Sequence, residues 1–389
     1  MKRRRLLFYC QPVLGMGHLV RSLAILRGLS DFEIWLVNGG MPLGEETRHL
    51  IPTGLHTIDL PPLIADRDFS EVRSTDPSVD LSLIRARRKS LLIETLTAIN
   101  PDILLIELYP FGRLKFDFEL RPLLETAQGM AFPPRIVCSL RDILVTKRDQ
   151  EAFEQFATAT ANQFFDLILI HSDPDFQPLG ETFPPVDRLT SEIKYTGYVL
   201  PSSSPTTSSP EPKVEPTIVA SIGGGRVGVE LLEATIAASQ QLHQIRPHRL
   251  RIFTGPYLPA CDWQRLVAAA AHDDWISVLR FTPNLLEEMR AAALSISMAG
   301  YNTCLELLLA GTPSIVYPFT GNNNDEQTLR ARKLEAFGVV KALTARELTP
   351  ASLAMIIRGM IDQPPPRPQP VIDLEGARKT AQFLRELLT

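Results

Sequence analysis

The sequence SMAGYNTCLELLLAGTPSIVYPFTGNNNDEQTLRA, residues 297–331, decides the fold that we predict for this chain. A short apolar run ends at Gly300, and a helix is predicted over residues 303–310. Gly311 ends that helix, a second apolar run covers residues 314–319, and a polar loop rich in asparagine follows. This order is typical of an open α/β sheet, in which turns at the carboxyl ends of the strands present backbone N–H groups to a ligand.

The composition indicates a globular protein of about two domains, because single hydrophobic cores stop growing near 250–300 residues and this chain has 389. Lysine and arginine number 40 and aspartate and glutamate 44, so the net charge is −4 and offers no global field for a nucleic-acid partner. The four cysteines lack C-x-x-C spacing, which argues against a disulfide or metal framework and favours a reducing compartment.

The chain begins with MKRRRLLFYCQPVLGMG, a basic segment followed by an apolar run that is too short for a signal peptide. We therefore predict a cytoplasmic protein whose first strand follows this basic segment. No apolar run approaches the roughly 18 residues of a membrane span. Two interpretations of the basic residues stay open, peripheral contact with the inner face of a membrane and simple exposure to solvent.

The first half of the chain has the pattern of a parallel sheet. Residues 6–10 are a predicted strand, residues 18–29 an amphipathic helix and residues 32–37 the next strand, so that His18 begins the helix of a βαβ unit. Continuous apolar runs predict further strands at residues 103–106, 135–140 and 167–170, with a short last strand within 194–200 and helices over 81–99 and 148–165. Polar residues follow these strands, where the ligand crevice of such sheets lies.

The pattern restarts after a Ser/Thr/Pro-rich segment, residues 201–216, which buries too little apolar surface to order itself. The second half contains predicted strands at 217–222, 250–253, 275–279 and 294–297, and helices at 229–242 and 284–293. A final helix is predicted over 374–388. We therefore predict two Rossmann-like parallel-sheet domains, residues 1–200 and 217–370, a linker at 201–216 and a separate C-terminal helix in residues 371–389.

Three glycines, Gly223, Gly224 and Gly225, stand between the first strand and helix of the second predicted domain, and Arg226 follows them. Glycine permits positive φ and close approach of an anion to the N–H groups at a helix start. A tight turn without a ligand explains the same residues, so both interpretations stay open.

The acidic residue of the opening stretch, Glu306, also has two interpretations. Its carboxylate is suited to accept both hydroxyls of a ribose, while Thr303 and Glu306 also have the spacing of a capping box that only satisfies the helix start. Asn323, Glu326 and Gln327 are suited to sugar hydroxyls, or they form an ordinary polar loop.

His18 is the candidate general base, because its ordinary pKa is near neutrality and it follows a strand at the carboxyl edge. The alternative is a histidine near a helix N-terminus that makes one backbone hydrogen bond. Glu107 and Asp142, which follow two other predicted strands, are the substitutes for the base. The D-x-D sequences at 66–68 and 173–175 are interpreted as loops, and no metal ion is predicted.

Two motifs together resemble a known family. The run GMGHLVRS, residues 15–22, and the C-terminal stretch SMAGYNTCLELLLAGTPSIVYPF with the later E-Q and R-A pairs resemble the GT-B glycosyltransferases related to MurG. That group is glycosyltransferase family 28, and plant galactolipid synthases are relatives. The resemblance covers both predicted domains.

The resemblance implies an N-terminal acceptor domain, a C-terminal nucleotide-sugar domain, a cleft between them, and a last helix, in residues 371–389, that packs back on the N-terminal domain. It implies that Glu306 binds the ribose, that Glu326 and Gln327 hold the donor sugar, that Phe281 lies in the loop that reads the base, and that His18 lies near the reacting centre. The Tyr301-Asn302 pair departs from the family pattern. The full set of predicted donor residues is Gly17, Gly223, Gly224, Gly225, Arg226, Phe281, Gly300, Tyr301, Asn302, Thr303, Glu306, Asn323, Glu326 and Gln327.

We therefore expect transfer of a sugar from a nucleoside diphosphate sugar to an acceptor hydroxyl, with inversion, without a metal ion and without a cofactor. UDP is the nucleotide that the family implies, and the acceptor is a glycan, a lipid or a small molecule. The alternatives are a nucleotide-sugar epimerase or hydrolase of the same fold, and a non-catalytic nucleotide-sugar-binding protein.

Overall fold

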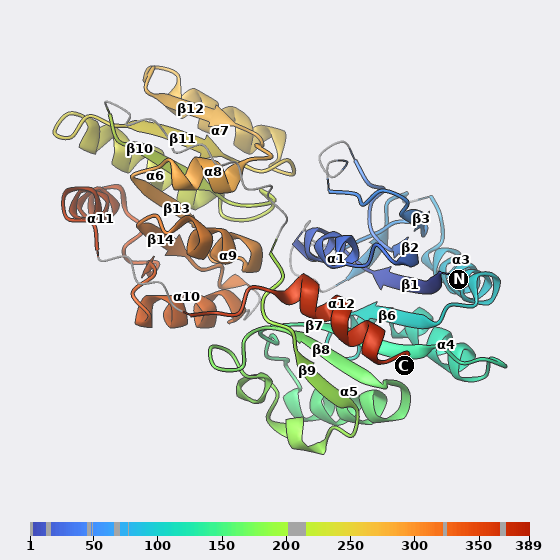
Figure 1. The fold of residues 1–389 in the computed structure, drawn as a ribbon. Coiled ribbons are helices and arrows are strands. Elements are labelled where there is room, and N and C mark those ends of the chain that lie inside the picture. Colours follow the sequence, from blue (N-terminus) through green and yellow to red (C-terminus); the bar gives the residue numbers. More distant parts are fainter. Residues whose placement is uncertain are drawn as a thin grey trace. The chain divides into compact units, whose positions relative to one another are not determined.

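The computed structural model describes residues 3–12, 17–44, 48, 50–65, 71–76, 78–200, 215–321, 325–365 and 371–389. The chain divides into two compact units (Figure 1). The first unit is Met1–Pro201 together with Ile372–Thr389, and the second unit is Ser202–Val371.

The first unit is built on a seven-stranded sheet of order β3-β2-β1-β6-β7-β8-β9, in which every pairing is parallel. A short antiparallel hairpin, β4-β5, accompanies it. The strands are β1 Arg4–Cys10, β2 Phe32–Asn38, β3 His56–Asp59, β4 Leu63–Ala65, β5 Val72–Ser74, β6 Ile103–Glu107, β7 Arg135–Arg141, β8 Leu167–His171 and β9 Glu192–Tyr195.

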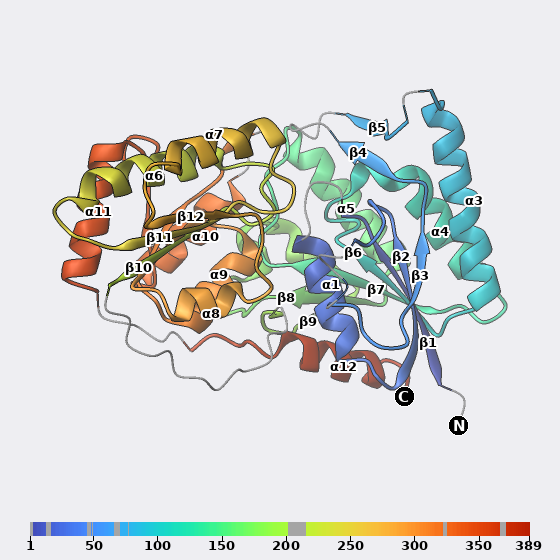
Figure 2. The same ribbon diagram turned by 90° about the horizontal axis from the view of Figure 1, so that it is seen from above.

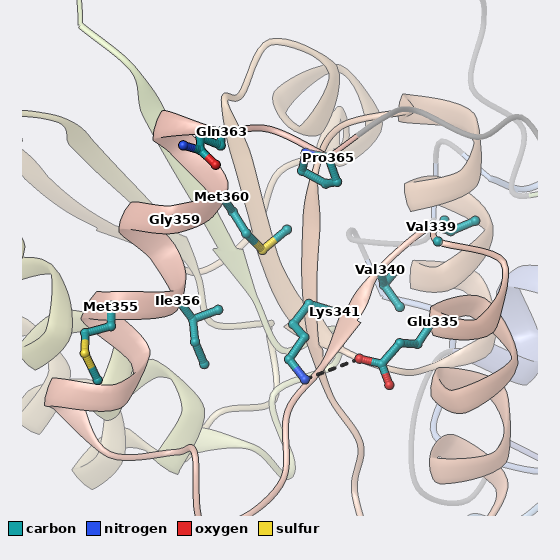
Figure 3. A pocket seen from close by; sticks show the side chains of 11 residues that line it. Glu335, Val339, Val340, Lys341, Met355, Ile356, Gly359, Met360, Gln363 and Pro365 are labelled. Carbon is teal, nitrogen blue, oxygen red and sulfur yellow. Dashed lines mark hydrogen bonds and ion pairs between the residues drawn. The ribbon is translucent and has the colours of Figure 1, made fainter.

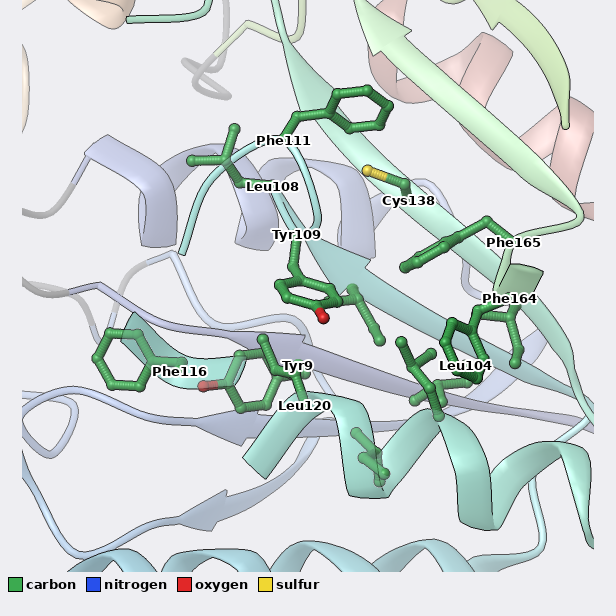
Figure 4. Packing of buried hydrophobic residues seen from close by; sticks show 14 of the residues in the cluster. Tyr9, Leu104, Leu108, Tyr109, Phe111, Phe116, Leu120, Cys138, Phe164 and Phe165 are labelled. Atoms are coloured by element: carbon green, nitrogen blue, oxygen red, sulfur yellow. The ribbon is translucent and has the colours of Figure 1, made fainter. Parts of the chain in front are cut away.

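Both faces of this sheet are buried, which explains why its central strands are continuous apolar runs. The helices α3 (Leu81–Ile99), α4 (Asp117–Gln128) and α5 (Gln150–Phe164) cover one face. Figure 4 shows part of that core, where Tyr9 of β1 and Leu104 of β6 lie among aromatic side chains. The helices α1 (Gly17–Arg27) and α12 (Gly376–Glu386) cover the other face.

The C-terminal helix α12 packs on α1 within the first unit. Its Leu384 is fully buried, and Arg385 pairs with Asp31 at 2.7 Å. Arg4 donates to the carbonyls of Arg385 and Leu388, where a cation satisfies the open C-terminus of a helix. The basic segment at the start of the chain thus has a structural use at this position.

The second unit has a six-stranded parallel sheet of order β12-β11-β10-β13-β14-β15. Its strands are β10 Thr217–Ser221, β11 Arg249–Phe253, β12 Ile276–Leu279, β13 Leu294–Met298, β14 Ser314–Tyr317 and β15 Lys341–Ala342. Its helices are α6 Val229–His243, α7 Ala260–Ala270, α8 Leu285–Arg290, α9 Tyr301–Ala310, α10 Glu326–Ala336 and α11 Pro350–Asp362. The core on one face is formed with α6, α7 and α11, while α8 and α9 lie together on the other face (Figure 2).

The predicted α/β class with two parallel sheets is confirmed, although some element bounds differ. The strand expected within 194–200 is observed earlier, as β9. The strand expected over 314–319 ends at Tyr317, because Pro318 follows and cannot donate to a neighbouring strand. The helix expected from Thr303 begins two residues earlier, at Tyr301. Among the described residues, no helix combines the length and the apolar character that a membrane span requires.

Candidate active site

In the first unit the structure brings together two predicted residues that are 89 positions apart. His18 is near the start of α1, and its Nδ1 lies 2.6 Å from Oε1 of Glu107, the last residue of β6. Arg21, one turn further along α1, donates to the same oxygen at 2.6 Å. Arg113 lies 3.4 Å from the other carboxylate oxygen. A histidine and two arginines therefore converge on one fully buried carboxylate.

The chain after β6 turns sharply to allow this convergence. Leu108 and Arg113 have φ values of 68° and 59°, the left-handed region that residues other than glycine adopt only when their surroundings hold them there. The turn folds Arg113 back toward the strand end that it has just left. The left-handed backbone positions and the charges around Glu107 therefore lie at the same edge of the sheet.

The charges set the protonation states of the pair. Burial would raise the pKa of Glu107, but His18, Arg113 and Arg21 hold it well below its usual range. Burial lowers the pKa of His18 to about 4, against the opposing effect of Glu107. The imidazole is therefore neutral near pH 7. An ionised carboxylate only accepts hydrogen bonds, so the proton of the ring lies on Nδ1 and Nε2 keeps its lone pair.

This geometry separates the three predicted candidates for the base. His18 has a side chain that is 22 % exposed, and its Nδ1 partner is a side chain rather than the backbone group of the alternative interpretation. Glu107 is buried against three cationic or polar partners, so it is suited to orient His18 and poorly placed to take a proton itself. Asp142 follows β7 and is fully buried, and its role as a substitute base stays a prediction.

In the second unit the predicted glycine turn follows β10. Gly223 and Gly225 have φ values of 63° and 86°, so both positions favour glycine. A Cβ on Gly225 would lie 2.4 Å from the carbonyl oxygen of Thr254. The turn is therefore packed tightly against the loop that follows β11. Arg226 lies over the ring of Tyr257, 5.1 Å from its centroid.

The start of α9 excludes one of the two interpretations of Glu306. Gly300 is the N-cap, with an extended φ of −68° and ψ of 155°, and Tyr301 is the first helical residue. Thr303 is consequently inside the helix, so Thr303 and Glu306 do not form a capping box, and that interpretation is wrong. The helix started earlier than predicted because a glycine N-cap gives no side-chain signal in the sequence.

Glu306 itself is half-buried and has no hydrogen-bond or ion-pair partner among the residues that the structure describes. Burial raises its pKa to about 7. A carboxyl group in this state is costly to ionise, and hydroxyl donors from a ligand would offset that cost. The ribose-binding interpretation of Glu306 therefore stays a prediction.

Except for Gly17, which begins α1 of the first unit, the remaining predicted donor residues lie on segments of the second unit. Phe281 is 42 % exposed in the loop between β12 and α8. Glu326 and Gln327 begin α10, but both are engaged: Glu326 pairs with Arg330 at 2.8 Å, and Gln327 accepts from the backbone N–H of Phe319 at 3.0 Å. The other positions are Gly17 at the start of α1, the central Gly224 of the glycine turn, and Asn302 within α9. Asn323 lies outside the described residues.

Sequence reasoning missed three arginines that complete these arrangements, namely Arg21, Arg113 and Arg330. A lone arginine on a helix is usually solvent-exposed, and only the fold shows which carboxylate it meets. Of the two D-x-D sequences, the one at residues 66–68 lies outside the described residues. In the other, Asp173 accepts from the backbone N–H groups of Asp175 and Asp373, which is a loop function. Within the described part of the chain, no group of three metal-ligating side chains occurs.

A separate hollow of about 450 Å³ lies between α10, β15 and α11 (Figure 3). Glu335 pairs there with Lys341 and also accepts from the N–H of Ala342 at 3.0 Å, which covers part of the open sheet edge. None of the predicted donor residues lines this hollow.

The chain has the GT-B glycosyltransferase fold, because its two parallel α/β sheets are shared with solved structures of glycosyltransferases. Residues 219–381 match the model of the glycosyltransferase family 28 C-terminal domain. The predicted resemblance to the MurG-like group is thereby confirmed.

Two similar proteins are N-acetylglucosamine transferases named UDP-N-acetylglucosamine--N-acetylmuramyl-(pentapeptide) pyrophosphoryl-undecaprenol N-acetylglucosamine transferase. The one from Desulfitobacterium hafniense is 30% identical over 126 residues, which is 32% of this chain and 29% of that protein. The one from Caulobacter vibrioides is 26% identical over 200 residues, 49% of this chain and 54% of that protein. The matched segment thus spans only about a third to a half of these relatives.

Solved structures share the fold over the whole chain. MurG of Acinetobacter baumannii superposes with a TM-score of 0.61 at 17% identity, covering 98% of this chain and 99% of that one. Arabidopsis thaliana UGT89C1, complexed with quercetin, has a TM-score of 0.66 at 16% identity and full coverage of both chains. A putative UDP-N-acetylglucosamine 2-epimerase from Listeria monocytogenes has a TM-score of 0.64 at 12% identity, covering 99% and 95%.

Proposed function

We propose that this chain is a glycosyltransferase that moves a sugar from a UDP-sugar to an acceptor hydroxyl, with inversion at the sugar carbon and without a metal ion. The observation that carries the proposal is Glu306, a half-buried carboxyl without a partner in the described structure, nearly two helical turns beyond the glycine N-cap of α9. The matched family domain and the names of the two relatives support a nucleotide-sugar donor.

In this proposal the second unit binds the donor. The ribose hydroxyls donate to Glu306, and the diphosphate lies against the N–H groups at the start of α9 and at the Gly223–Gly225 turn. Phe281 contacts the base from the loop after β12. Helix N-termini and backbone donors supply the positive potential for the leaving diphosphate, which is why the mechanism needs no divalent cation.

The first unit supplies the base. Nε2 of His18 takes the proton of the acceptor hydroxyl as its oxygen attacks the anomeric carbon, and the bond from that carbon to the diphosphate oxygen breaks. Glu107 accepts from Nδ1 and thereby fixes the tautomer that leaves Nε2 unprotonated. Attack from the face opposite to the leaving diphosphate gives inversion.

A thermal-shift measurement tests the donor part of the proposal. A ligand that binds only the folded chain raises its melting temperature by mass action. UDP and one or more UDP-sugars should raise it in the wild-type protein and less in Glu306→Gln. Equal shifts in both proteins would remove Glu306 from the donor site, and no shift with any nucleotide would refute the donor class.

A second candidate function is that of a nucleotide-sugar epimerase or hydrolase, because a putative epimerase is among the structures that share this fold. The reaction product distinguishes it from a transferase. Incubation with a UDP-sugar and no acceptor should leave the UDP-sugar intact if the chain is a transferase. Formation of an epimer would identify an epimerase, and release of free sugar a hydrolase.

The acceptor and the cellular location belong to the same proposal, and we place the protein in the cytoplasm. In the described part of the basic start, Arg4 is engaged with the end of α12. The first half of α3 is a better surface, because Leu83 is 65 % exposed and Arg85, Arg87 and Lys89 are exposed beside it. Retention on vesicles with phosphatidylglycerol, and its loss in a triple Arg85→Gln, Arg87→Gln, Lys89→Gln variant, tests peripheral contact.

A further inference from the structure

Arg330 is a buried cation whose two terminal nitrogens bind two different segments of the second unit. It lies on α10 and is only 3 % exposed. One nitrogen donates to the carbonyl oxygen of Ala299 at 3.0 Å, and the other donates to Oε1 of Glu326 at 2.8 Å. The guanidinium carbon also lies 5.7 Å from the ring centroid of Tyr301.

These contacts all end at helix starts. Ala299 immediately precedes Gly300, the N-cap of α9, and Tyr301 is the first residue of that helix. Glu326 is the first residue of α10. The planar guanidinium therefore connects the beginning of α9 with the beginning of α10, two places where unsatisfied N–H groups and the positive end of a helix dipole are found.

A lysine could not make the same connection. Its ammonium is a point donor on a flexible stem, whereas the guanidinium presents several N–H groups in a fixed plane and remains charged when buried. Burial of a charge is costly unless it is paired and hydrogen-bonded, and here the carboxylate and the carbonyl supply both. The arrangement is well suited to hold two loops in a fixed relation.

We infer that Arg330 is a positioning residue of the donor site, which holds Glu326 and the turn before α9 so that both meet the diphosphate and the sugar of one donor molecule. The inference rests on the proposed function. Arg330 acts through its partners: it orients the carboxylate of Glu326 toward sugar hydroxyls and fixes the backbone that leads to Gly300. Glu306, further along α9, binds the ribose without the help of Arg330.

The division between ribose and diphosphate-sugar contacts gives the test. Dissociation constants of UMP, UDP, UDP-glucose and UDP-N-acetylglucosamine are measured by calorimetry for the wild-type protein, Arg330→Lys, Arg330→Met and the control Arg332→Met. Arg332 lies on the same helix and is exposed. The quantity compared between proteins is the dissociation constant of UMP divided by the dissociation constant of the UDP-sugar that binds most tightly.

Arg330→Lys should reduce this ratio by about tenfold or more while UMP binds as in the wild type, since a hydrogen bond to a charged group is at stake. Arg332→Met should leave the ratio unchanged. Weakening of all four ligands by one common factor, or no change in the ratio, would overturn the inference. If Arg330→Met does not fold, Arg330→Lys alone decides. Wild-type protein that binds none of the four ligands refutes the proposed function, and the inference falls with it.

Discussion

The replacement Glu306→Gln should make the second unit more stable at alkaline pH and at the same time weaken its binding of UDP. These opposite effects follow from one property. Glu306 is half-buried, without a partner among the described residues, and burial raises its pKa to about 7 from an ordinary value of 4.5. Glutamine keeps the shape of the side chain and removes the charge.

The magnitude follows from linkage. The folded-state pKa of this acid lies above its unfolded-state value, so the stabilising contribution of the protonated form is complete below pH 4.5 and is lost as the pH rises through about 7. A shift of this size corresponds to about 3 kcal/mol of unfolding free energy, and partial exposure of the side chain reduces it to about 2 kcal/mol. The difference between Glu306→Gln and wild type should therefore grow by about 2 kcal/mol from acid to alkaline pH.

The assay must report on the second unit alone, since a chain of two units need not unfold in one step. Of the three tryptophans, Trp35 lies in the first unit, and Trp263 and Trp275 lie in the second. In a Trp35→Phe background, the fluorescence during urea unfolding comes from the second unit. Unfolding curves at several pH values, without and with UDP, give both the stability difference and the affinity.

With UDP present, the ribose hydroxyls should favour the ionised carboxylate, so UDP affinity should rise with pH in the wild type and be flat in Glu306→Gln. At alkaline pH the variant should bind UDP more weakly by about 1–3 kcal/mol, the cost of losing a charged hydrogen-bond acceptor. Glu125, an exposed residue of α4, provides the control Glu125→Gln. Parallel pH profiles for Glu306→Gln and wild type would refute the reasoning.

Three further predictions concern the base, the glycine turn and the buried core. His18→Ala and Glu107→Gln should each lower kcat by about 10²–10⁴ with little change in donor affinity. The wild-type kcat/KM should fall as the pH decreases through about 4, where His18 becomes protonated. Stopped assays over a range of pH values measure both effects. Gly225→Ala should destabilise the second unit by more than about 3 kcal/mol, because positive φ and a close carbonyl both oppose a Cβ, and urea unfolding checks it. Arg88 of α3 and Glu119 of α4 form a fully buried ion pair at 2.7 Å. Arg88→Met should cost about 3–5 kcal/mol because it leaves the charge of Glu119 buried without its cation, and denaturation of the first unit would detect this loss.

Periodicity and turn residues predicted most of the fold. The central strands of both sheets are apolar because helices cover both faces, and that cause is visible in the sequence at strands such as β6 and β13. The edge strands were not predicted, because the prediction relied on continuous apolar runs. The strand β3 is partly exposed, and β15 has only two residues, so neither carries a continuous apolar run.

The candidate site was predicted in part. The positions of His18 and Glu107 at the carboxyl edge follow from the βαβ pattern, whereas their contact depends on which strands are neighbours, and β6 pairs directly with β1. The buried ion pair between Glu326 and Arg330 could not be predicted from the βαβ pattern. Glu326 and Arg330 are one helical turn apart, but whether such a pair is buried or exposed depends on the packing of α10.

The charge balance around Glu107 explains why a histidine and a carboxylate in contact need two arginines. A carboxylate alone beside His18 would favour the imidazolium and leave a base that is already protonated. Arg21 and Arg113 engage the same carboxylate, so its negative charge is compensated without a proton on Nε2. The carboxylate can then serve as a hydrogen-bond acceptor that fixes the tautomer, while burial keeps the ring neutral. The two arginines are thus part of the reason that the residue near the start of α1 is able to act as a base.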